Sequence, residues 1–111
     1  MRRSIVAALA ATVLTFVGLV RADAQTPIRV GFMTTKTGPL AAIGLQMETG
    51  LLQFLKEKNY LLAGRKVELY TVDTAATPAV AKSKLQELSQ RDKVHVVLGP
   101  LAAFEALAID D

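Results

Sequence analysis

The chain has no cysteine and only one histidine, His95, among its 111 residues. The absence of cysteine excludes disulfide bonds and thiolate metal sites, and it removes the residue that a bacterial lipoprotein needs after its signal. Because no carboxylate stands near His95 at the spacing of a metal site, we expect this residue to have a structural role in a strand. The sequence therefore predicts neither a metal site nor a bound cofactor.

Two further patterns are missing, and each absence argues against a class of function. Gly31, Gly38 and Gly44 do not have the G-x-G-x-x-G spacing of a dinucleotide-binding turn. No pairing of a nucleophile with a general base is recognisable along the chain, so we do not expect an enzyme.

The N-terminus has the three regions of a secretory signal peptide. Two arginines come first, an uncharged run follows over residues 4–20, and an A-x-A cleavage site ends at Ala24. We predict a signal peptide over residues 1–24, cleaved near Ala24, that directs the mature chain to the periplasm. A retained membrane anchor is the alternative, although the uncharged run is shorter than the ~20 residues of a membrane span. The paired arginines leave open whether export is general or twin-arginine.

The charge of the chain gives no indication of a nucleic-acid surface. Without residues 1–24 the chain keeps ten basic and nine acidic residues, so its net charge falls from +3 to +1. In the second half of the chain, basic residues are interspersed with Glu87 and Asp92, which is typical of a solvent-exposed helix face. Nucleic-acid binding is therefore not expected.

Short apolar segments alternate with amphipathic segments along the mature chain. The apolar segments predict strands over residues 28–34, 66–73 and 94–99. The amphipathic segments predict helices over residues 40–58, from residue 77 onward and over residues 100–109. Residues 61–64 are predicted to form a turn.

The spacing of apolar residues indicates which side of the first two helices faces the core. Apolar residues recur every three or four positions in both helices. In the first helix the predicted buried stripe consists of Ile43, Met47, Leu51, Phe54 and Leu55. In the second helix, which Thr77 caps and Pro78 opens, the predicted stripe consists of Ala81, Leu85 and Leu88.

Alternating strands and helices with short connections predict a three-layer α/β fold around a parallel sheet. Parallel neighbours need a helical crossover, and right-handed crossovers favour the strand order 2-1-3. The third strand would then have an open apolar edge, which native sheets rarely leave exposed. We therefore interpret residues 25–111 as an incomplete lobe to which more sheet is expected to be added.

In a sheet of order 2-1-3, the first and third strands are neighbours whose following helices lie on opposite faces. A crevice opens there, at the carboxyl ends of the strands, between residues 35–40 and residues 100–103. Gly-Pro pairs at residues 38–39 and 99–100 precede the two helices, whose free backbone N–H groups favour a carboxylate. Ordinary helix-starting turns remain the alternative interpretation. Asp73 is expected to cap the turn after the second strand.

Three segments resemble the Leu/Ile/Val-binding family of periplasmic proteins: TGPLAAIG at residues 37–44, AGRKVEL at residues 63–69 and VHVVLGPLAA at residues 94–103. The resemblance implies a type I periplasmic-binding fold with two lobes, several times this length, of which residues 25–111 form part of the N-terminal lobe. It further implies the extracytoplasmic substrate-binding component of an ABC uptake transporter, which passes its solute to an ABC permease in the inner membrane.

The resemblance also implies which residues bind the ligand. The first loop of the family usually reads Ser-Gly-Pro, and Thr37 keeps the hydroxyl here. The family commonly has two serines in the third loop, where this chain has Ala102 and Ala103. The predicted ligand-binding residues are Thr37, Gly38, Pro39, Ile43, Leu101, Ala102, Ala103 and Phe104. Loss of both hydroxyls and the added apolar surface predict a hydrophobic carboxylate, either an aromatic or a branched-chain acid.

Two other functions are compatible with the same sequence. One is a ligand-sensing domain of the same fold in a receptor or regulator, which a retained anchor would favour. The other is an enzyme of the flavodoxin-like or hydrolase kind, which would need catalytic residues outside residues 25–111.

Overall fold

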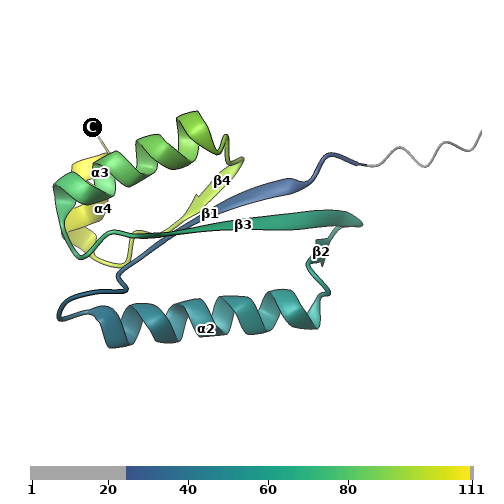
Figure 1. Ribbon diagram of the computed structural model, residues 1–111, viewed down its shortest axis with the longest axis horizontal. Helices are drawn as coiled ribbons and strands as arrows, with labels where there is room; N and C mark the ends of the chain where they lie inside the picture. The colour runs from purple at the N-terminus through teal and green to yellow at the C-terminus, as the bar shows by residue number, and fades with distance from the viewer. Residues whose placement is uncertain (1–24, 111) are drawn as a thin grey trace, which may run out of the picture.

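A four-stranded sheet forms the middle layer of the computed structural model, which describes residues 25–110. Helix α2 covers one face of the sheet, and α3 and α4 cover the other (Figure 1). The strands are β1 (Ile28–Thr34), β2 (Leu61–Leu62), β3 (Arg65–Asp73) and β4 (Val96–Leu98). The helices are α2 (Ala41–Glu57), α3 (Pro78–Gln86), the π-helical turn η1 (Glu87–Arg91) and α4 (Ala103–Ile109). The predicted signal peptide, residues 1–24, lies outside the described residues.

The order of the strands is β2-β3-β1-β4, and β1 is parallel to both of its neighbours. Among the three parallel strands this is the predicted order 2-1-3, and the three-layer α/β fold is confirmed. Strand β1 pairs with β3 along its whole length, from Ile28 opposite Val67 to Thr34 opposite Asp73. The two strands therefore end side by side, and this brings the loops that follow them together.

The predicted turn over residues 61–64 is wrong in part, because this segment contains strand β2. Leu61 and Leu62 pair antiparallel with the first residues of β3. Ala63 and Gly64 join the two strands with φ angles of 50° and 75°. This left-handed pair is the geometry of a two-residue hairpin, which normally has asparagine or aspartate where this chain has alanine.

The third strand and the third helix are shorter than predicted. Strand β4 covers Val96–Leu98 instead of residues 94–99. Just before Val96, the side chain of His95 takes the place of a backbone acceptor in the pairing with β1. The Nδ1 atom of His95 accepts the Arg29 N–H at 2.9 Å, while the His95 N–H donates to the Arg29 carbonyl at 2.8 Å. Helix α4 begins at Ala103, not at residue 100, because Ala102 keeps an extended backbone.

Apolar side chains form a separate core on each face of the sheet, since successive strand residues point to opposite faces. The core under α3 contains Met33, Val72, Ala81 and Leu88. The core under α2 contains Val30, Leu55 and Val67, with Leu51 packed against it. The predicted stripe of the second helix is confirmed, with Ala81 and Leu88 fully buried and Leu85 half-buried, although Leu88 belongs to η1.

The predicted stripe of the first helix is wrong for three of its residues. Ile43, Met47 and Phe54 are 51%, 44% and 44% exposed, whereas Gly44 and Leu55 are the buried residues of α2. Two sets of positions in this helix have apolar residues at helical spacing, one including residues 43, 47 and 54 and the other residues 51 and 55. Periodicity alone cannot choose between them, and the packing of Gly44 on β1 selects the second set.

Among the described residues, β4 pairs only with β1, so the outer edge of the sheet is open. Val96 and Leu98 lie on the same face as Val30 and Phe32 and are 46% and 40% exposed. The expectation that more sheet is added at this edge stays a prediction. No helix within residues 25–110 has both the length and the apolar character that a membrane crossing requires.

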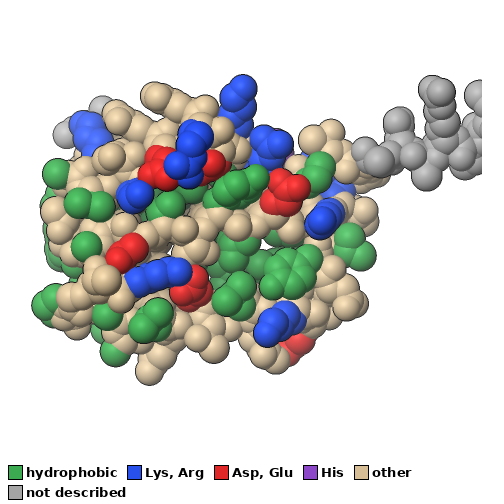
Figure 2. Space-filling view, viewed as in Figure 1, with side chains coloured by type: hydrophobic (Ala, Val, Ile, Leu, Met, Phe, Trp, Pro, Cys, Tyr) green, Lys and Arg blue, Asp and Glu red, His purple; other side chains and the backbone are tan. Residues whose placement is uncertain are grey.

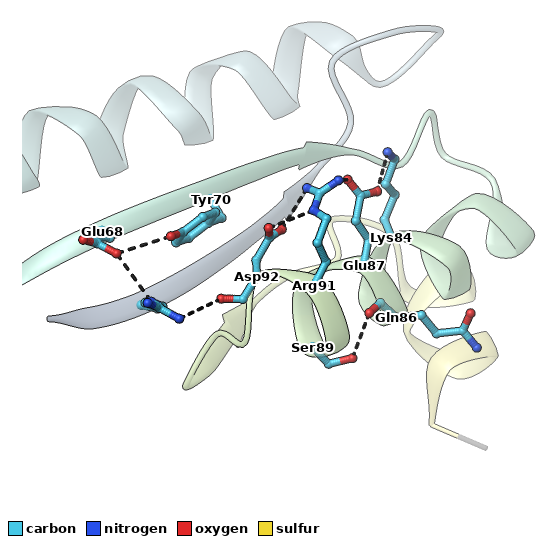
Figure 3. Close-up of polar contacts among 9 residues, drawn as sticks. Glu68, Tyr70, Lys84, Gln86, Glu87, Ser89, Arg91 and Asp92 are labelled. Carbon is cyan, nitrogen blue, oxygen red and sulfur yellow. Dashed lines mark hydrogen bonds and ion pairs between the residues drawn. The ribbon is translucent and has the colours of Figure 1, made fainter. Parts of the chain in front are cut away.

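Ion pairs around η1 and an ion pair between β1 and β3 are linked by one hydrogen bond (Figure 3). Arg91 contacts the carboxylates of Glu87 and Asp92, and its hydrogen bond to Asp92 holds the pKa of that carboxyl below its usual value. Arg29 on β1 contacts Glu68 on β3 at 3.5 Å and donates to the Asp92 carbonyl oxygen at 3.4 Å. Such solvent-exposed pairs contribute little to stability, so the network is a structural link on the surface.

Two glycines allow backbone segments to approach closely at the carboxyl end of the sheet. A β-carbon at Gly44, on the inner side of α2, would overlap the carbonyl oxygen of Thr35. A β-carbon at Gly99 would overlap the carbonyl oxygen of Met33. Gly50 lies on the same helix as Gly44, but a β-carbon there meets nothing within 4 Å. The start of α2 is therefore fixed against β1 by the absence of a side chain at Gly44.

This difference between two glycines of one helix gives a matched test. We expect Gly44→Ala to lower the free energy of unfolding by about 1–3 kcal/mol, because the new methyl group displaces backbone. Gly50→Ala should raise it by about 0.4–1 kcal/mol, since it only restricts the unfolded chain and favours the helix. Urea denaturation of both variants measures the difference, and a stabilising Gly44→Ala would contradict the described packing.

Candidate functional site

Two loops leave the same end of the sheet from neighbouring parallel strands (Figure 1). The first loop, residues 35–40, joins β1 to α2, and the second loop, residues 99–102, joins β4 to α4. Gly38 and Gly99 therefore lie at one end of the sheet, in loops that lead to helices on opposite faces. This is the arrangement in which open α/β sheets bind ligands.

The residues predicted to bind ligand differ in their exposure at this end of the molecule. Thr37, Gly38 and Pro39 are exposed in the first loop, and Ile43 is 51% exposed at the start of α2. In and after the second loop, Leu101 is half-buried, Ala102 is buried, Ala103 is exposed and Phe104 is 49% exposed. Two exposed apolar side chains thus lie one on each helix that follows a loop.

Residues 25–110 enclose no pocket of their own. Within the same range, no three His, Cys, Asp or Glu side chains gather closely enough to hold a metal ion. In the view of Figure 2, charged side chains of both signs are mixed over the upper part of the molecule, where α3 and η1 lie. The candidate site is therefore the open surface formed by the two loops.

Asp73 holds the first loop to the end of β3. One oxygen of its carboxylate, Oδ1, accepts the Lys36 N–H at 2.8 Å and the Ala75 N–H at 2.9 Å. The other oxygen, Oδ2, accepts the hydroxyl of Thr37 at 2.9 Å. The bond from Ala75 is the turn cap predicted from the sequence. The two bonds to the first loop were not predicted, and the only signal for them is the pairing of β1 with β3.

The hydrogen bonds around Asp73 favour its charged form. Burial raises the pKa of this carboxyl, but the N–H groups of Lys36 and Ala75 and the hydroxyl and N–H of Thr37 together outweigh burial. The pKa of Asp73 therefore lies below its usual value of 3.8. The native contacts of the first loop depend on a carboxylate that stays ionised.

Buried threonines anchor the base of the first loop. Thr34, Thr35 and Thr74 are fully buried. Thr34 Oγ1 donates to the Gly44 carbonyl at 3.2 Å, and the hydroxyls of Thr35 and Thr74 are 3.3 Å apart. These contacts join the ends of β1 and β3 to the start of α2, so the first loop begins from a rigid base.

Glu105 holds the second loop in a similar way. Its Oε2 atom accepts the Ala102 N–H at 3.3 Å, and the side chain is fully buried. Its Oε1 atom has no hydrogen-bond partner among the described residues. Ala102 occupies the N-cap position of α4, where alanine offers no acceptor to the first turn, whereas a serine would.

The lowered pKa of Asp73 gives a pH-dependent prediction. Because the folded pKa lies below the unfolded one, the stabilisation is present above about pH 4 and is lost as pH falls through the folded value. We expect Asp73→Asn to lower the free energy of unfolding at pH 7 by about 1 kcal/mol. This is less than is usual for hydrogen bonds to a charged group, because the carboxylate is partly exposed. Urea denaturation should show that the free energies of unfolding of Asp73→Asn and wild type differ less near pH 3 than at pH 7. Asp110→Asn is the control, and an unchanged difference at low pH would contradict the assignment.

Comparison with known proteins identifies relatives of the chain. The family model for periplasmic binding proteins matches residues 27–111. An ABC transporter substrate-binding protein from Sphaerobacter thermophilus is 36% identical, with a TM-score of 0.72, over 76% of this chain and 23% of its own. No curated protein matches the chain.

Two further solved structures contain ligands. A solute-binding protein of an ABC transporter from Rhodopseudomonas palustris, in complex with 3,4-dihydroxybenzoic acid, is 34% identical with a TM-score of 0.71, over 74% of this chain and 23% of its own. A branched-chain amino acid transporter substrate-binding protein from Streptococcus pneumoniae, in complex with isoleucine, is 28% identical with a TM-score of 0.71, over 76% and 25%. The chain thus spans about a quarter of the length of these relatives. The resemblance predicted from three sequence motifs is confirmed.

Proposed function

Since this chain belongs to the periplasmic binding protein family, we propose that it serves in the solute-binding component of an ABC uptake transporter for amino acids or related hydrophobic carboxylates. Residues 25–111 would contribute to the N-terminal lobe of a two-lobed protein that is exported to the periplasm behind a signal peptide, residues 1–24. The loaded protein would pass its solute to an ABC permease in the inner membrane. The single observation that carries this proposal is the position of the two Gly-Pro loops on neighbouring parallel strands.

The geometry supports binding of a carboxylate by backbone N–H groups, but with fewer donors than the sequence suggested. The N–H groups of Lys36 and Ala102 already donate to Asp73 and Glu105. The N–H group of Ala103, at the exposed start of α4, has no acceptor among residues 25–110. It is available to a ligand, as charge-assisted bonds from such donors are strong enough to orient a small acid.

The side chains around the loops favour a solute with an apolar body. Ile43 and Phe104 are exposed on the two helices that follow the loops, and Ala102 and Ala103 provide no hydroxyl for an ammonium group. Both a branched-chain amino acid and an aromatic acid are bound by relatives. We therefore propose an aromatic or branched-chain acid in preference to a free amino acid.

Calorimetry on a two-lobed protein that carries this chain tests the solute class. We expect benzoate to bind more tightly than leucine. Ala103→Ser should strengthen leucine binding by about fivefold, because it adds one hydrogen-bond partner for the amino acid worth roughly 1 kcal/mol. Ala79→Ser, on the exposed surface of α3, is the control and should change neither affinity. Tight leucine binding without any binding of aromatic acids would contradict the proposal.

The chain alone is expected to bind solutes weakly. Proteins of this kind gain affinity when two lobes close over the ligand, and one lobe leaves most of the bound surface in water. Thermal unfolding of residues 25–111 should therefore give the same melting temperature with and without benzoate or leucine. A clear rise with either solute would show that this lobe already holds a complete site.

The relatives favour transport over the alternative of a ligand-sensing domain, because those described above are components of ABC transporters. Family membership likewise favours binding of the solute without turnover.

A further inference from the structure

The hydroxyl of Thr37 has one hydrogen to donate, and it donates that hydrogen to Asp73. The distance from Thr37 Oγ1 to Asp73 Oδ2 is 2.9 Å, and an ionised carboxylate can only accept in this contact. The low pKa of Asp73 keeps the carboxylate ionised at neutral pH. Thr37 is therefore not free to donate to a ligand while this bond is made.

Asp73 connects this hydroxyl to the backbone of the same loop. The Lys36 N–H donates to Asp73 Oδ1 at 2.8 Å, so two consecutive residues of the first loop are bound to a single carboxylate. The carboxylate is itself fixed from behind by the Ala75 N–H at 2.9 Å. The ammonium group of Lys36 also pairs with Glu48 of α2 at 2.7 Å.

We propose that Thr37 and Asp73 form a latch that holds the first ligand loop in its binding shape. Asp73 is a positioning residue in this latch, and the Thr37 hydroxyl acts through Asp73 and not on the solute. This inference rests on the proposed function, because it assigns roles within the same site. It changes the role predicted for Thr37 from ligand contact to loop support.

The latch gives different expectations for substitutions of similar size. Thr37→Val keeps the volume of the side chain but removes the donor, so it should release Asp73 Oδ2. Thr37→Ser keeps the donor and should preserve the latch. Thr49→Val is the matched control, since Thr49 donates its hydroxyl to the Leu45 carbonyl at 2.8 Å within α2 and is not bonded to Asp73 or Ala75.

Amide hydrogen exchange on the full chain tests the latch without any ligand. The Lys36 amide should exchange slowly in wild type, in Thr37→Ser and in Thr49→Val. It should exchange about tenfold faster or more in Thr37→Val, which frees one oxygen of the carboxylate, and in Asp73→Asn, which replaces the charged acceptor with a neutral amide. Equal protection of the Lys36 amide in all variants would overturn the latch, whether or not the proposed function is correct. Circular dichroism on each variant shows that the chain is still folded.

A double-mutant cycle on the two-lobed protein, with benzoate and leucine as probes, separates loop support from ligand contact. If the latch acts as a unit, Thr37→Val and Asp73→Asn each weaken binding by about tenfold, and the double variant is no weaker than either single variant. Thr37→Ser should keep wild-type affinity. Independent losses that multiply in the double variant would mean that Thr37 contacts the solute, and they would overturn the proposal. If wild type binds neither probe, the proposed solute class fails, and the exchange measurement alone decides on the latch.

Discussion

Parallel hydrogen bonding of β1 to a neighbour on each side determines where every loop of the candidate site lies. Because β1 runs parallel to both β3 and β4, all three strands end at the same edge of the sheet. The register places Asp73 opposite Thr34, so a carboxylate at the end of one strand stands beside the loop that follows the other. Without this pairing, Asp73 would be a turn cap and nothing more. The location of the site is therefore determined first by the register of the strands and only then by its side chains.

Much of the fold could be predicted from the sequence, because the relevant signals are local. Short β-branched runs identify parallel strands, and the handedness of crossovers leaves few possible orders. The errors arose where local signals are ambiguous. Strand β2 was missed because its hairpin turn has Ala63 in place of the asparagine or aspartate that marks such turns. The buried side of α2 was assigned wrongly because two apolar stripes have the same period, and only the contact of Gly44 with β1 distinguishes them.

The candidate site was less predictable, because its defining contacts join residues far apart in the sequence. The Gly-Pro pairs indicate the two loops, since each precedes a helix at a strand end. The carboxylates that hold these loops have no local signature of that role. Asp73 lies 36 positions from Thr37, and the bond between them follows only from the register of β1 with β3. Glu105 is closer to its partner Ala102, but nothing in the local sequence indicates that its side chain is fully buried.

The use of carboxylates to hold both loops bears on the kind of solute that the site can accept. Asp73 and Glu105 each occupy a backbone N–H of a loop, so the loops gain hydrogen bonds to the fold and lose free donors. A site with few free donors is poorly suited to a solute held mainly by polar contacts. This agrees with the proposed solute, whose affinity would come mainly from burial of an apolar body. The alanines at positions 102 and 103 also favour an apolar solute, because they provide apolar surface in place of a polar contact.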